Sequence, residues 1–351
     1  MKPDSTLNFD FVPYWTIPFR FFVTAPLFAV IAGLLLTFLG AESLLGSELV
    51  LWQSRWFKEV IAALHLITIG TVTMVMVGAL FQITSVVGGR LLPGGKVVPL
   101  IVYSCLLLGA LLFLIAMLNS LVWLYAITAL LIVTGLLVLA CSGLAAIYRA
   151  KRRSPTLISM QLSLLSLLVM IGVGGALLLM HGYPESIGFD RRWTDFHLLW
   201  ALAGWVGLLI MGVSFQVVPM FHVTPSFNAQ FQIWLPVVTF LSLIAASVTA
   251  YINNGVMAVL ITKYAVLLCY GVYGAYMWRL LDKRKRKIED ITVLFWKTAV
   301  LSMAGFIILQ VISEFDILRN RGDQLWLLSG VLLIFGVIVS VVGGMLQKIV
   351  P

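Results

Sequence analysis

Charged residues are scarce in this sequence, and their scarcity excludes most classes of soluble protein. Only 11% of the residues are Asp, Glu, Lys or Arg, whereas 61% are hydrophobic. A soluble domain carries about 25% charged residues. Apolar runs of about 18 residues or more recur along the whole chain, which is the pattern of a protein that crosses a membrane many times.

Acidic residues and cysteines are also few. The chain has 14 Asp and Glu against 23 Lys and Arg, which gives a net charge of +9. This basic excess does not indicate nucleic-acid binding, because the cations form short clusters beside apolar segments, where they set membrane orientation. The three cysteines, Cys105, Cys141 and Cys269, lie far apart inside apolar segments. Neither a disulfide framework nor a zinc site is therefore indicated.

The apolar runs predict about ten transmembrane helices, each long enough to cross a hydrocarbon core of about 30 Å. These segments fill the chain almost completely, so the sequence predicts an all-α polytopic membrane protein with one transmembrane domain over residues 1–351. We expect the spans at 20–40, 60–86, 97–118, 121–148, 156–180, 195–220, 232–252, 255–280, 291–314 and 325–348.

Lys and Arg are concentrated in alternate loops of this arrangement. One set contains the basic sequences GGRLLPGGK, YRAKRR and RLLDKRKRK. The opposite set, with GYPESIGFDRRWTD and EFDILRNRGDQ, mixes Arg with Asp and Glu. The positive-inside rule then places both termini in the cytoplasm.

Histidine is rare as well, with four residues in the chain. In the predicted orientation His65 lies near the outer end of the second span, His181 ends the fifth span, and His197 begins the sixth. An ionisable residue within a membrane is costly and marks a functional site by default. We predict His65 and His197 as ligands of a metal or cofactor, with His181 as a third candidate. His222 lies at the opposite end, in the polar turn HVTPSFNAQ, and is expected to be structural.

Two spans share a phrase. HLITIGTVTMVMVGALFQI begins at His65 and HLLWALAGWVGLLIMGVSFQV at His197; both contain G-x7-G-x2-F-Q, starting at Gly70 and Gly204, with the histidines two residues out of register. The glycines could serve close helix packing. Alternatively, His197, Ala201 and Gly204 line one helix face, where an imidazole above small side chains could hold a flat macrocycle. Two such helices would give bis-histidine ligation of a b-type haem.

Three phrases resemble a known group of proteins. PFRFFVTAPLFAVIAGLLL, LHLITIGTVTMVMVGALFQI and DFHLLWALAGWVGLLIMGVSFQVVPMF are similar to bacterial membrane proteins related to NnrS and, more distantly, to the catalytic subunit of haem-copper oxidases. The resemblance covers roughly the first two-thirds of the chain. It implies an oxidase-like helical bundle in the bacterial inner membrane, with one or two b-type haems and with copper as a further option. It also implies a role in electron transfer or in binding nitric oxide or oxygen.

The chain departs from the oxidase pattern in its histidines. In the oxidases a haem-ligating histidine lies near the outer end of the second span, which matches His65. The oxidase active site needs more histidines than the four present here, and this sequence has no His-His pair. The resemblance therefore implies haem binding without a complete haem-copper active site, and leaves open whether the chain is an enzyme.

Cations in and beside the later spans are further candidates. Lys263 lies well inside the eighth span, where it could pair with Glu314 or Asp316, or contact a haem propionate. Arg319 and Arg321 lie in a predicted outer loop, and guanidinium groups suit carboxylates such as propionates. Charge balance with neighbouring acidic residues is the alternative for both arginines.

Two other functions fit the same sequence. A secondary transporter would use Lys263 as a coupling site, although the two similar helices run parallel rather than inverted. A non-catalytic accessory subunit would only pack within a respiratory membrane complex. The expected partners are the lipid bilayer, a redox partner or a gas ligand such as nitric oxide or oxygen, and either a second copy of the chain or a respiratory complex. No nucleic acid is expected.

Overall fold

The computed structural model describes residues 13–45, 55–89, 91–150, 153–188, 190, 192–252, 255–286, 288, 290–314 and 322–349. Every regular element in these ranges is a helix. Ten helical segments among them are long and apolar enough to cross a membrane. The prediction of an all-α polytopic membrane protein is confirmed, because each predicted span has a counterpart whose ends agree to within four residues.

Seven of the spans are single α-helices, and three also contain a π-helical segment, labelled η. In chain order the helices of the described residues are α1 (Thr16–Leu44), α2 (Lys58–His65), η3 (Leu66–Thr73), α3 (Met74–Gly88), α4 (Val97–Asn119), α5 (Val122–Tyr148), α6 (Pro155–Gly182), α7 (Pro184–Ile187), α8 (Arg192–Leu198), η4 (Leu199–Gly207), α9 (Leu208–His222), α10 (Ala229–Ile252), α11 (Val256–Asp282), α12 (Ile291–Ile312), α13 (Gly322–Val331), η6 (Leu332–Val339) and α14 (Ser340–Ile349).

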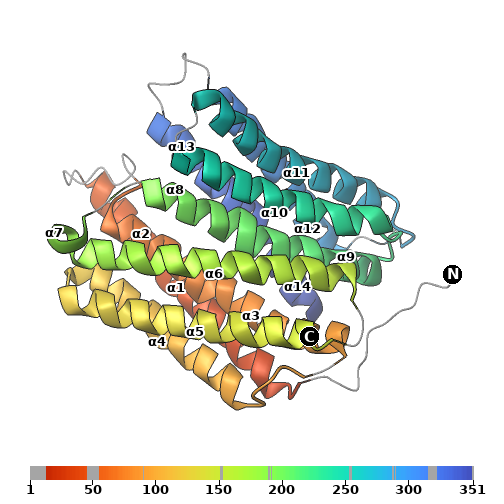
Figure 1. Ribbon diagram of the computed structural model, residues 1–351, viewed down its shortest axis with the longest axis horizontal. Coiled ribbons are helices and arrows are strands. Elements are labelled where there is room, and N and C mark those ends of the chain that lie inside the picture. Colours follow the sequence, from red (N-terminus) through yellow and green to blue (C-terminus); the bar gives the residue numbers. More distant parts are fainter. Residues whose placement is uncertain are drawn as a thin grey trace. The chain divides into compact units, whose positions relative to one another are not determined.

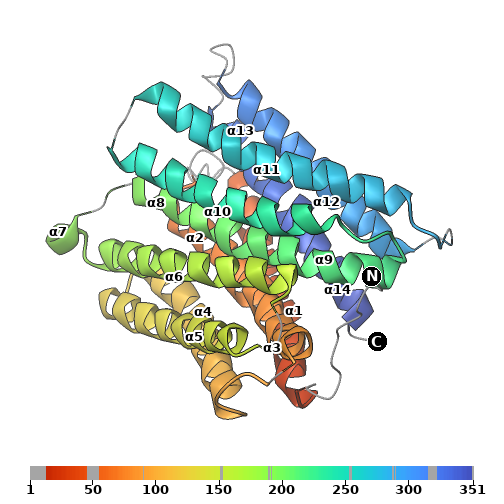
Figure 2. The ribbon, with the colours of Figure 1, turned by 45° about the vertical axis from the view of Figure 1, so that its right-hand side comes forward.

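The chain divides into two compact units. One transmembrane domain over residues 1–351 stays a prediction. The first unit comprises Met1–Leu157 and Leu164–Ala201, and the second comprises Ile158–Ser163 and Leu202–Pro351. Within the first unit α4 lies beside α5 (Figure 1), as expected for two helices joined by a short turn. Within the second unit α10 lies beside α11 and α11 beside α12 (Figure 2).

Apolar side chains cover the outer surfaces of the spans. Leu34 in α1, Leu130 in α5 and Leu268 in α11 are each 66–67% exposed. Soluble proteins rarely leave extended apolar patches in water. These exposed faces fit a lipid bilayer, in agreement with the partner expected from the composition.

Glycines in the second span allow α1 to pack closely against it. A Cβ atom at Gly70 would lie 2.5 Å from Cγ of Phe28, and one at Gly78 would lie 2.8 Å from Cε1 of Phe22. The phenyl rings therefore fill the space that the absent side chains leave. This is the close approach through small residues that membrane helices favour.

Candidate functional site

The structure brings together the two histidines that the sequence favours. His65 is the last residue of α2 and His197 lies in α8, and both belong to the first unit. Their ring centres lie 6.4 Å apart, with 16° between the ring planes. Two imidazoles bound through Nε2 to one metal at about 2.0–2.1 Å each would have ring centres roughly 6 Å apart. The separation of the ring centres therefore permits a shared metal ion.

Each imidazole uses Nδ1 in a bond to a backbone carbonyl. Nδ1 of His65 lies 2.8 Å from the carbonyl oxygen of Ile61, and Nδ1 of His197 lies 3.2 Å from that of Met170. A carbonyl oxygen only accepts hydrogen bonds, so these contacts assign the proton to Nδ1 in both rings. Nε2 is then the unprotonated nitrogen, ready to act as a ligand. Metal-binding histidines are commonly oriented by this kind of bond.

Neighbouring helices fix the positions of both rings. The ring of Phe113 in α4 stacks on His65 with 4.4 Å between centres and 22° between planes. In α6, a Cβ atom at Gly174 would lie 2.7 Å from Cε1 of His197. Both histidines are partly buried.

A π-helical segment follows each of the two histidines. Leu66, directly after His65, begins η3, and Leu199, two residues after His197, begins η4. A π-helix widens the helical turn, so it alters which side chains share a face, and such segments are frequent at functional sites. The two similar sequence segments therefore both adopt a π-helical backbone shortly after the histidine, one residue after His65 and two residues after His197.

Side chains of the second unit satisfy the carbonyl groups of η4. The hydroxyl of Ser163 donates to the carbonyl oxygen of Trp205 at 2.8 Å, and the hydroxyl of Tyr270 donates to that of Ala203. Gly207 provides room for this tyrosine, since a Cβ atom there would collide with the Tyr270 hydroxyl. These bonds stabilise the π-helical backbone, because apolar surroundings make an unpaired carbonyl costly.

His181, the third predicted ligand, lies in the same unit as His65 and His197. The three histidines do not form a three-ligand metal site. Its ring centre is 6.5 Å from that of Tyr125. Among the residues that the structure describes, no group of three or more His, Cys, Asp or Glu side chains is placed to hold a metal ion. Haem does not need such a group, because the porphyrin supplies four nitrogens and the protein only the axial ligands.

The two glycines predicted to make room for a haem, Gly70 and Gly204, have different surroundings. Gly70 faces Phe28 of α1, so the structure gives it a role in helix packing. Gly204 is buried within η4 and falls in the second unit.

A comparison with protein-family models and one with curated proteins find no match to this chain. The similarity to NnrS-like proteins and to haem-copper oxidases therefore depends on the three quoted phrases, and it stays a prediction.

The predicted cations are only partly described. Within the second unit, Nζ of Lys263 donates to Oε1 of Glu314 at 2.8 Å and lies 5.7 Å from the ring centre of Tyr264. The pairing with Glu314, one of the roles expected for this lysine, is therefore present. Asp316, Arg319 and Arg321 lie outside the described residues.

Two cations near the histidine pair were not predicted as site residues. Arg55 forms an ion pair of 2.8 Å with Asp195 and places its guanidinium 4.7 Å from the ring centre of Trp56. Nζ of Lys58 donates to Oγ of Ser120 at 2.8 Å. Arg55 thereby links the start of one histidine-bearing span to the start of the other. The signal in the sequence was the phrase SRWFKEV, which places both cations shortly before the histidine of the second span.

Proposed function

We propose that this chain is a haem-binding membrane protein in which His65 and His197 are the axial ligands of one b-type haem. The observation that supports the proposal is the pair of imidazoles 6.4 Å apart, each with its Nδ1 against a backbone carbonyl oxygen. The resemblance of the surrounding phrases to NnrS-like and oxidase sequences points to the same cofactor and to a bacterial inner membrane.

The donor set is suited to a low-spin haem. Neutral imidazole is a suitable ligand for iron, and two imidazoles from different helices can bind a haem from its two faces. When bound, such a haem supplies one-electron redox chemistry. The protein residues hold the ligands in place: the carbonyl groups of Ile61 and Met170 orient the rings, and Phe113 packs against one of them.

This arrangement favours electron transfer over gas binding. His65 and His197 would together hold such a haem and would leave no ligand position for nitric oxide or oxygen. We therefore propose a redox partner of the chain as its functional partner, with a gas ligand as the second option that the NnrS resemblance suggests.

Absorption spectra of the purified full chain, expressed with an adequate haem supply, test this proposal. The wild type should show a Soret band that shifts on reduction. His65→Ala and His197→Ala should each lose most of the band, because one remaining imidazole holds haem weakly. His181→Ala and His222→Ala are matched controls that should keep it. A wild type without a Soret band, or a band that survives in both ligand variants, would contradict the proposal.

A further inference from the structure

His222, which the sequence indicates as structural, has an unusual environment at the end of α9. It lies at the opposite end of its span from His197, in the second unit. Its side chain is 0% exposed, and neither ring nitrogen has a hydrogen-bond partner within the described part of the chain. Buried polar groups are nearly always paired, so an imidazole with two unpaired nitrogens calls for an explanation.

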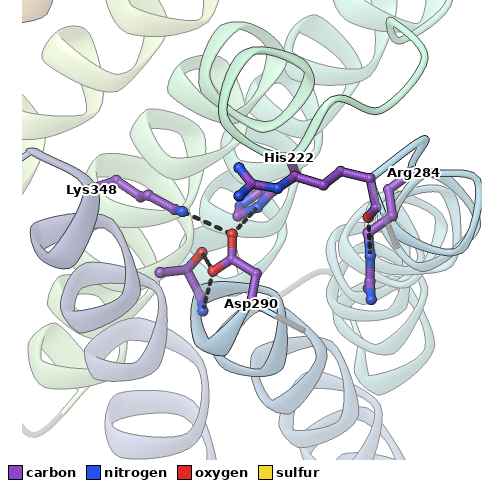
Figure 3. A network of polar contacts seen from close by, with 6 residues as sticks. His222, Arg284, Asp290 and Lys348 are labelled. Atoms are coloured by element: carbon purple, nitrogen blue, oxygen red, sulfur yellow. Dashed lines mark hydrogen bonds and ion pairs between the residues drawn. The ribbon is translucent and has the colours of Figure 1, made fainter. Parts of the chain in front are cut away.

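One carboxylate and two cations act on this imidazole. Nδ1 of His222 lies 3.8 Å from Oδ2 of Asp290, which is beyond hydrogen-bond distance (Figure 3). The same oxygen accepts a hydrogen bond from Nζ of Lys348 in α14 at 2.8 Å. Arg284, in the segment after α11, is close enough to act on the ring electrostatically. The imidazole therefore faces two positive charges and a carboxylate that is already neutralised.

The other oxygen of Asp290 is also engaged. Oδ1 accepts from the backbone N–H of Thr292 at 3.0 Å and from its hydroxyl at 2.6 Å, which caps the start of α12. Although partial burial opposes it, the hydrogen bonds from Lys348 and Thr292 hold the pKa of Asp290 below its usual value. The carboxylate is thus ionised at neutral pH and committed to partners other than His222.

The same residues and their neighbours connect four parts of the second unit. The backbone N–H of Lys285 donates to the carbonyl oxygen of Val223 at 3.0 Å, and Val223 adopts a left-handed conformation with φ of 51°. We call the set of His222, Val223, Lys285, Asp290 and Lys348 the clasp. It joins the end of α9, the segment after α11, the start of α12 and the end of α14.

We propose that His222 is a proton-binding site that opens the clasp when the pH falls. A neutral imidazole can occupy its buried position, whereas an imidazolium there would be desolvated, and Lys348 and Arg284 would oppose the attraction that Asp290 exerts on it. In an open arrangement water would solvate the charged ring. Proton binding therefore favours the open form, and the closed form loses stability as the pH falls through the ordinary histidine range near about 6.5. The charge pattern of the loops predicts that this end of the span faces the cytoplasm.

Amide hydrogen exchange of the full-length protein, followed by mass spectrometry, tests this proposal. The peptide that contains the amide of Lys285 reports opening directly, because that amide bonds to Val223 in the closed clasp. Between pH 7.5 and 5.5, and after correction for the intrinsic pH dependence of exchange, its rate should rise by up to about tenfold per pH unit. Peptides from α4, in the first unit, serve as the internal control and should show no rise.

Three variants give the sign of the effect. His222→Gln should abolish the pH dependence. Asp290→Asn keeps an acceptor for Thr292 but removes the negative charge, so opening should begin at a higher pH. Lys348→Met removes a repelling charge and releases Oδ2 for the imidazolium, so opening should begin at a lower pH. A flat wild-type profile, a dependence that persists in His222→Gln, or shifts of Asp290→Asn and Lys348→Met in the same direction would each overturn the proposal. If His222→Gln fails to fold, the opposite shifts of the other two variants decide the question.

Discussion

At the scale of single residues, His197 is positioned by a backbone carbonyl and by a missing side chain. Nδ1 faces the carbonyl oxygen of Met170, and Cε1 occupies the space beside Gly174. Both residues belong to α6, so this helix sets the height and the rotation of the ring. Neither contact could be predicted from the sequence. Gly174 lies in an ordinary apolar run, and every residue has a carbonyl oxygen, so the sequence does not indicate which one will contact the ring.

Gly174→Ala should displace His197. The new Cβ atom would lie 2.7 Å from Cε1 of the ring, and overpacking of this kind costs about 1–3 kcal/mol of stability. We expect a lower haem-to-protein ratio and a lower unfolding temperature in the purified variant. Gly172→Ala is the matched control, since Gly172 is exposed on the same helix with nothing within 4 Å of the added atom. Equal haem content in the two variants would show that Gly174 does not position the ligand.

At the scale of helices, the sequence allows two roles for the glycines of the G-x7-G-x2-F-Q motif: close helix packing and haem binding. For Gly70 the structure shows Phe28 in the vacant space. In both histidine-bearing spans the structure shows a π-helix after the histidine, which the spacing of apolar residues in the sequence does not predict. The π-helical form of η4 depends on distant partners, among them Ser163 and Tyr270, and such partners are set by tertiary packing rather than by local sequence.

Gly70→Ala tests the packing of α1 against the second span. The added Cβ atom would lie 2.5 Å from Phe28, whose ring is almost fully buried and cannot move freely. We expect a loss of about 1–3 kcal/mol in the free energy of unfolding, measured by denaturant or thermal unfolding in detergent. Gly33→Ala, at an exposed position of α1 with nothing within 4 Å, should cause no loss. Similar stabilities of the two variants would contradict the close packing at Gly70.

At the scale of the whole molecule, the sequence predicts the spans well because long apolar runs are a strong and local signal. The pairing of His65 with His197 was also predictable, since the charge of the loops placed both at one membrane depth. The division of the chain into two units was not, because it depends on which helices contact one another. The ion pair of Arg55 with Asp195 was missed for the same reason.

The clasp also concerns the whole molecule, because its residues come from three stretches that are far apart in the sequence, 222–223, 285–290 and 348. His222 lies in a polar turn of the sequence, yet its side chain is buried. A single sequence reports the polarity of a turn but not the helix that covers it.

Proton binding at His222 and haem binding at the histidine pair are separate proposals, and each has a test that the other does not affect.

The amount of haem b per chain, measured as the pyridine haemochrome of purified protein, decides whether His65 and His197 hold a haem. The wild type should contain one haem b per chain, and the double variant His65→Ala/His197→Ala should contain none above background. A wild type that contains no haem, or a double variant that contains as much as the wild type, would contradict the proposed haem site.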